Sequence, residues 1–274
     1  MFQPLLQDLQ RGEPAPFRRC MSLIFLLFAM CFTTSSRADD ITLAVAANFI
    51  SAAKQLAADF EAQSDHQITI AVGSTGAHYA QIRHGAPFDI FFAADAATPK
   101  RLEYEKRIIP NSRFTYAQGQ LVLWNPKAAQ VEETSNVPTE VLIQKALTET
   151  SFSHLAIANP RLAPYGLAAQ QTLMNLGLLD ALQTKIVRGE NVGQSYQFIH
   201  SGAATLGFVS LSQIIGQGQR SRGAYWLVPQ KLYTPIEQQA VLLTDNKAAR
   251  EFLVFVRSDA GKKIIEASGY SVAD

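Results

Sequence analysis

Apolar positions along the chain follow two alternating patterns, short continuous runs and longer stretches with helical spacing. Residues 41–46, apolar apart from Thr42, form a run that is typical of a buried strand, and residues 49–60 carry apolar side chains at helical spacing. The same order of strand and helix recurs from residues 67–72 and from residues 88–93. Strands that alternate with helices predict a parallel sheet with right-handed crossovers.

The stretch at residues 114–124 is longer than a typical strand and has Gly119 inside it, and it predicts a strand that leaves this first lobe and enters a second. The second lobe repeats the pattern, with strands expected at residues 154–158, 184–187 and 205–209. Residues 236–243 are expected to return to the first lobe, where two helices finish the chain. The sequence therefore predicts an α/β fold of two lobes, each a mostly parallel sheet flanked by helices, with a ligand in the cleft. The predicted boundaries are 39–118 and 215–274 for lobe 1, and 119–214 for lobe 2.

The first residues differ from the rest and resemble an export signal. Arg18 and Arg19 precede an apolar run at residues 21–32, and small and polar residues follow as far as Ala38. This arrangement predicts a signal peptide over residues 1–38, cleaved after Ser-Arg-Ala, and a periplasmic location. The apolar run is shorter than the ~20 residues that a membrane span needs. A twin-arginine signal is a weaker alternative, because the residues around the arginine pair match it poorly.

Both cysteines, Cys20 and Cys31, lie in this leader, so the exported chain has no cysteine for a disulfide, a nucleophile or a metal site. Cys31 is a poor candidate for lipidation, because Met30 stands where such sites use a small residue. Without residues 1–38 the chain keeps 20 basic and 21 acidic residues, a net charge of −1. This balance lacks the basic footprint of nucleic-acid binding. No second long apolar run follows, so we expect the exported protein to be soluble.

Four strand-to-helix joints contain small, hydroxyl or amide residues, two in each lobe. They lie at Asn48 and at residues 73–76, 164–166 and 191–193. Ligands of open α/β sheets bind beyond the carboxyl ends of the strands, so two facing lobes would direct all four joints into one cleft. The first amides of a helix lack internal partners and carry the positive end of its dipole, so they can hold an anion without Lys or Arg. The alternative is that Ser74 or Thr75 only caps its own helix.

A fully ionised oxyanion accepts hydrogen bonds and donates none, so its site should contain donors alone. Charge-assisted hydrogen bonds to such an anion are stronger than neutral ones. The joints supply side-chain donors at four positions, Asn48, Ser74, Thr75 and Tyr165. Val192 can supply only its backbone N–H.

Six segments together resemble a known family. They are residues 46–49 (AANF), 73–76 (GSTG), 85–95 (GAPFDIFFAAD), 114–124 (FTYAQGQLVLW), 158–166 (ANPRLAPYG) and 190–194 (ENVGQ). This combination, across essentially the whole exported chain, is similar to the periplasmic molybdate-binding proteins of ABC importers. The resemblance implies a type II periplasmic binding-protein fold whose lobes close over tetrahedral molybdate or tungstate. It also implies delivery to a membrane permease, with no cofactor and no metal other than molybdenum as molybdate, and we expect a monomer.

By motif position, the resemblance implies oxyanion contacts from Asn48, Thr75, Tyr165 and Val192, with Ser74 close by. Many relatives have a hydroxyl residue at the position of Ala47 and a tyrosine at that of Ser210. Here Ala47 offers only its N–H and Ser210 is short, so both are further candidates and the number of contacts stays open.

Other functions are less well supported by the residues. A secreted hydrolase is the enzyme alternative, yet no histidine of the exported chain lies in a spaced metal motif, and residues 193–197 lack the second glycine of a nucleophile elbow. Residues 73–76 lack the lysine of a phosphate-binding P-loop. Sulfate or phosphate binders are closer alternatives, and ferric-iron carriers would need acidic partners that the first joint lacks. A regulator's sensor domain is disfavoured by the leader and by the lack of a DNA-binding helical segment.

Overall fold

The computed structural model describes residues 40–128, 137–148, 151–216 and 223–272. The predicted signal peptide, with Cys20 and Cys31, lies outside the described residues. No helix within the described ranges has the length and apolar character that crossing a bilayer requires.

The first lobe is built on a five-stranded sheet in the order β2-β1-β3-β10-β4. Its strands are β1 (Asp40–Ala46), β2 (Gln67–Gly73), β3 (Ile90–Phe92), β4 (Phe114–Gly119) and β10 (Ile236–Leu242), and β10 runs antiparallel to its two neighbours. Its helices are η1 (Ala47–Phe49), α2 (Ile50–Glu61), α3 (Thr75–Arg83), α4 (Ala97–Tyr104), α10 (Lys247–Arg257) and α11 (Asp259–Ala267). Every predicted strand-to-helix step of this lobe is present.

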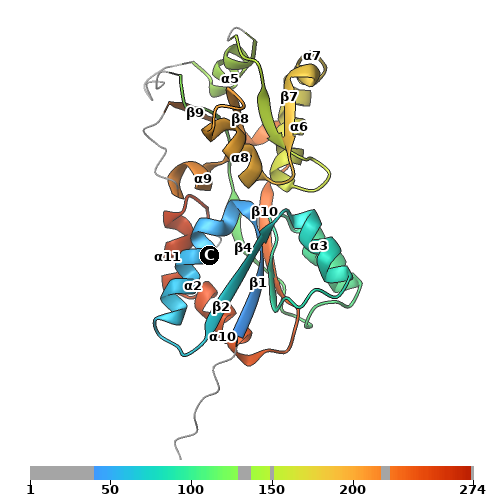
Figure 1. The fold of residues 1–274 in the computed structure, drawn as a ribbon, viewed down its shortest axis with the longest axis vertical. Coiled ribbons are helices and arrows are strands. Elements are labelled where there is room, and N and C mark those ends of the chain that lie inside the picture. Colours follow the sequence, from blue (N-terminus) through green and yellow to red (C-terminus); the bar gives the residue numbers. More distant parts are fainter. Residues whose placement is uncertain (1–39, 129–136, 149–150, 217–222, 273–274) are drawn as a thin grey trace, which may run out of the picture. The chain divides into compact units, whose positions relative to one another are not determined.

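The second lobe repeats this topology in the order β7-β6-β8-β5-β9. Its strands are β5 (Leu121–Asn125), β6 (Leu155–Ala158), β7 (Ile186–Gly189), β8 (Leu206–Ser210) and β9 (Ala224–Leu227), with β5 antiparallel to its neighbours. Its helices are α5 (Thr139–Thr148), α6 (Pro164–Asn175), α7 (Leu179–Leu182), η2 (Gln183–Lys185), α8 (Val192–His200), α9 (Leu211–Gly216) and η3 (Gln230–Leu232). The predicted architecture of two mostly parallel, helix-flanked sheets is confirmed (Figure 1).

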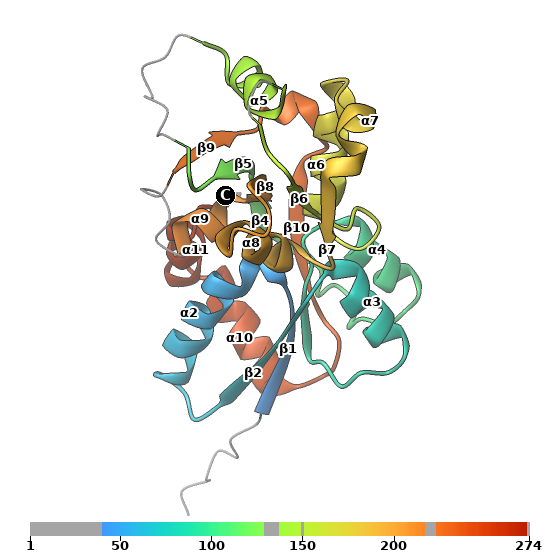
Figure 2. The same cartoon turned by 45° about the horizontal axis from the view of Figure 1, so that its top comes forward.

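Alternate side chains of the first sheet pack against different helices. Leu43 and Val45 of β1 belong to a core with Phe252 of α10, whereas Ala44 between them packs with Ile82 of α3. Helices α2 and α10 accordingly lie on one face of the sheet and α3 on the other (Figures 1 and 2). Burial on both faces explains why residues 43–46 of β1 are all apolar.

The chain passes between the lobes twice, and both passages differ in detail from the prediction. The run at 114–124 is two strands, because β4 pairs with β10 of the first sheet and β5 pairs with β8 of the second. The return lies between β9 and β10, later than the predicted boundary at residue 215, because β9 stays hydrogen-bonded to β5. Helix α6 begins at Pro164, inside the predicted joint at 164–166, because proline suits the first turn of a helix, and the short helix α7 is not among the elements predicted above.

Candidate functional site

A small cavity between the lobes brings the four predicted joints together. It is lined by Ala46, Ala47, Asn48, Gly73, Ser74, Thr75, Ala94, Ala163, Pro164, Tyr165, Asn191 and Val192. This set contains each of the five residues predicted to bind the ligand, as well as the further candidate Ala47. None of the lining side chains carries a charge, so any balance for a bound anion must come from dipoles and hydrogen-bond donors.

The start of α3 supplies two hydroxyl groups from the first lobe. Ser74 is the N-cap of α3, and its Oγ accepts a hydrogen bond of 3.4 Å from the N–H of Ala77. Thr75 is the first helical residue, and its Oγ1 accepts from the N–H of Ala94 at 2.9 Å. In both residues the oxygen accepts, so the hydroxyl proton remains to be donated. The capping role and a ligand-binding role of Ser74 are therefore compatible.

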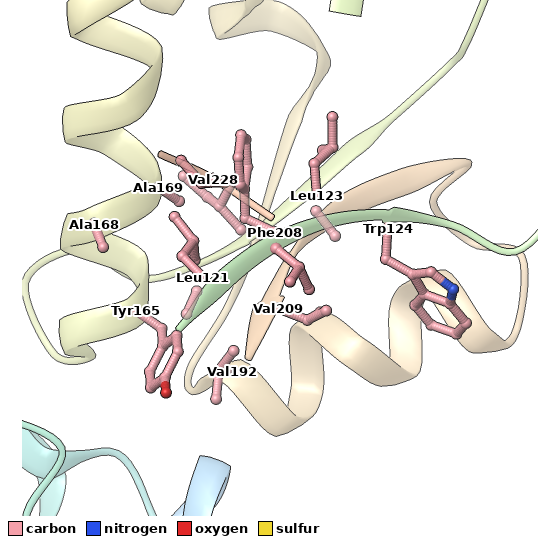
Figure 3. Packing of buried hydrophobic residues seen from close by; sticks show 14 of the residues in the cluster. Leu121, Leu123, Trp124, Tyr165, Ala168, Ala169, Val192, Phe208, Val209 and Val228 are labelled. Atoms are coloured by element: carbon pink, nitrogen blue, oxygen red, sulfur yellow. The ribbon is translucent and has the colours of Figure 1, made fainter. Parts of the chain in front are cut away.

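Helices α6 and α8 supply the donors of the second lobe. Val192 is the first residue of α8, whose N-cap Asn191 accepts from the N–H of Gln194 at 3.0 Å. The N–H of a first helical residue has no partner within its helix. Tyr165 follows Pro164 at the start of α6, and its hydroxyl projects out of the core cluster on the side where Val192 lies (Figure 3).

Asn48 takes a different role from the one expected of its side chain. Its Nδ2 donates to Oε1 of Gln238 at 2.7 Å and to the hydroxyl of Tyr270 at 3.0 Å, so both amide hydrogens are engaged inside the protein. The side chain therefore fixes η1 in place, and what Asn48 can offer to the cavity is its backbone N–H. Asn48 lines the cavity as expected, and its contact with a ligand stays a prediction, now through the backbone N–H instead of the side chain.

Ser210 does not line the cavity. It is fully buried at the end of β8, where its Oγ contacts Oγ of Ser212 at 2.9 Å and donates to Oε1 of Gln213 at 3.1 Å. Gln213 in turn donates from Nε2 to the carbonyl of Val192 at 3.1 Å. The structure thus places Ser210 behind the start of α8 and not at the cavity.

Sequence reasoning missed Gln238 and Tyr270. The hydroxyl of Tyr270 donates to the carbonyl oxygen of Asn48 at 2.7 Å or to Oγ of Ser212 at 2.9 Å. Burial raises the pKa of Tyr270 far above its ordinary value, so the hydroxyl stays protonated. No local motif marks either residue, since they lie 190 and 222 positions from Asn48 along the chain.

The two lobes are in direct contact beside the cavity. The N–H of Gly76, in the first turn of α3, donates to the carbonyl oxygen of Leu162 at 2.8 Å. On the other side, Oγ of Ser212 donates to the carbonyl of Asn48 at 3.0 Å. Contacts on both sides of the cavity therefore hold the lobes together, and separation of the lobes would widen access to it.

The arrangement suits binding better than acid–base or nucleophilic chemistry. Burial raises the pKa of Tyr165 well above its ordinary value, so its hydroxyl is a neutral donor. No His, Asp, Glu or Lys lines the cavity to act as a base beside the two hydroxyl groups of α3. Across the described ranges, no group of three His, Cys, Asp or Glu side chains is placed to hold a metal ion. The remaining donors match a fully ionised oxyanion.

Comparison with known proteins agrees with this geometry. Residues 41–271 match the family described as bacterial extracellular solute-binding protein. The chain is 42% identical over 253 residues to the molybdate-binding protein ModA of Azotobacter vinelandii, covering 91% of this chain and 97% of that protein. It is 40% identical over 248 residues to ModA of Rhodobacter capsulatus, covering 89% and 93%.

Among solved structures, the Azotobacter vinelandii periplasmic molybdate-binding protein superposes with a TM-score of 0.77 at 41% identity, covering 85% of this chain and 100% of that one. The two-lobed architecture is thus the type II periplasmic binding-protein fold. On sequence and structure together, the chain belongs to the family of bacterial extracellular solute-binding proteins.

Proposed function

We propose that this protein captures molybdate or tungstate outside the cytoplasm and delivers it to the membrane permease of an ABC importer. The observation that carries the proposal is the small cavity without charged side chains that Ser74, Thr75, Tyr165 and Val192 line together. Relatives that are 40–42% identical are molybdate-binding proteins, which supports the same ligand here. In this proposal the protein acts as a periplasmic monomer, needs no cofactor and catalyses no reaction.

The donors explain why a fully ionised dianion is the favoured ligand class. Phosphate carries a proton at neutral pH and needs an acceptor for it, and no carboxylate lines the cavity. Four helix beginnings, of η1, α3, α6 and α8, surround the cavity and carry partial positive charge. Sulfate has the same charge and shape as molybdate and is smaller, so it is the competitor that the test must include.

Calorimetric titration of the exported chain with molybdate, tungstate, sulfate and phosphate tests the proposal. We expect saturable binding of one molybdate or tungstate per chain, and weaker binding of sulfate and phosphate. Tighter binding of sulfate than of molybdate would assign the site to another oxyanion, and the lack of any oxyanion binding would refute the proposal.

The affinity for molybdate should not change between about pH 7 and pH 9. The raised pKa of Tyr165 keeps its hydroxyl protonated throughout this range, and desolvation lowers the pKa of the buried His78, which therefore stays neutral. Asp95 follows the lining residue Ala94 and burial raises its pKa, but Asp95 itself does not line the cavity. Titrations in buffers of equal ionic strength check this, and a loss of affinity toward pH 9 would indicate a titrating donor.

A further inference from the structure

Gly119 occupies the point where the chain first crosses between the lobes. It is the last residue of β4 and pairs with Ile236, the first residue of β10, so both crossing segments meet there. Its φ angle does not lie in the left-handed region. The backbone conformation therefore does not explain a glycine at this position.

The space beside Gly119 is filled by the end of the Tyr165 side chain. A Cβ atom at Gly119 would lie 2.1 Å from the hydroxyl oxygen of Tyr165, 3.0 Å from its Cζ and 2.6 Å from Nε2 of Gln238. Real Cβ contacts are not this short, so any side chain here must displace the hydroxyl. Tyr165 itself is only 2% exposed, and its ring is packed in the core of the second lobe.

Gln238 determines the hydrogen-bonding role of the Tyr165 hydroxyl. Its Oε1 accepts from Nδ2 of Asn48 at 2.7 Å, which turns Nε2 toward Tyr165, where it lies 3.4 Å from the hydroxyl oxygen. The Tyr165 oxygen thus accepts from Gln238, and its own proton is left to be donated. Gln238 is fully buried, so no water competes for this arrangement.

We propose that Gly119 is a positioning residue of the oxyanion site, whose missing side chain lets the Tyr165 hydroxyl sit against Gln238 with its proton directed to the ligand. This inference rests on the proposed function and adds a residue that makes no ligand contact. This role also couples the crossing strand β4 to the cavity, because a side chain at Gly119 would first displace the hydroxyl of Tyr165, the donor that α6 supplies. The competing explanation is that a glycine here only lets the crossing segment bend.

The test is a double-mutant cycle of Gly119→Ala and Tyr165→Phe, read by calorimetric titration with molybdate. Each single variant should weaken molybdate binding by about tenfold or more, because each removes the same donor from its place. In the double variant the hydroxyl donor is already absent, so Gly119→Ala should cost less than about threefold in affinity in the Tyr165→Phe background, although its methyl group still meets Cζ of residue 165 and Nε2 of Gln238. Gln118→Ala, at the exposed neighbouring position in β4, is the matched control and should bind as the unaltered protein does.

The results distinguish a positioning role of Gly119 from simple backbone bending, and they distinguish failure of that role from failure of the proposed function. If Gly119→Ala has no effect on affinity, or has an equal effect in both backgrounds, the positioning role is wrong and backbone bending is the better account. If Gly119→Ala fails to fold alone but folds together with Tyr165→Phe, thermal unfolding reports the same coupling and supports the role. Failure to fold in both backgrounds overturns it. If the unaltered protein does not bind molybdate, the proposed function fails first.

Discussion

Replacing Val192 with proline should weaken molybdate binding by about 10- to 150-fold. The change removes one N–H, and a hydrogen bond to a charged group contributes about 1.5–3 kcal/mol. Proline is well tolerated at the first position of a helix, and Asn191 before it is extended, with φ −147° and ψ 172°. Helix α8 should therefore form as before while the cavity loses a donor.

The matched control is Val192→Ala, which keeps the N–H and shortens only the buried side chain. We expect this variant to lose about 1–2 kcal/mol of unfolding free energy and to keep its affinity within about threefold. Calorimetric titration and thermal unfolding of both variants give the comparison. Equal affinities for the proline and alanine variants would show that the backbone of Val192 makes no ligand contact.

Replacing Thr75 with valine should affect both binding and stability. Valine has nearly the shape of threonine but no hydroxyl, so the ligand loses a donor and the N–H of Ala94 loses its acceptor. Ala94 is 2% exposed, and a buried unpaired N–H costs about 1–3 kcal/mol. We expect molybdate affinity to fall by about 10- to 150-fold and the free energy of unfolding to fall by about 1–3 kcal/mol.

Thr75→Ser keeps the hydroxyl and is the control for this change. Its affinity should stay within about threefold of the unaltered protein, because the donor and the acceptor for Ala94 are both retained. Denaturant unfolding separates the loss of stability from the loss of affinity. A valine variant that is destabilised but binds molybdate normally would leave Thr75 a structural residue only.

The sequence is informative about the site because its joints are local. Each joint follows the end of an apolar run and leads into the start of a helix, and these two signals lie within about ten residues of each other. Ser74 and Asn191 show this well, since each caps the helix that follows it. The parallel order of the strands then places all the joints at the same edge of their sheets.

What the sequence could not provide are contacts between distant segments. The side chain of Asn48 looks like a ligand donor until Gln238 and Tyr270 are in place beside it. The returning strand at 236–243 is predicted correctly, but the predicted boundary at residue 215 assigns β9 to the first lobe, because β9 has the same apolar character as any buried strand. Only its pairing with β5 shows to which sheet it belongs.

The hydrogen bond from the N–H of Gly76 to the carbonyl oxygen of Leu162 joins the two lobes through main-chain groups alone. One such bond contributes about 0.5–1.5 kcal/mol, which corresponds to about a 2- to 13-fold bias toward the shut form. The free energy of anion binding then has to drive only the remainder of lobe closure. The first turn of α3 thus contributes to closure of the lobes as well as to the lining of the cavity.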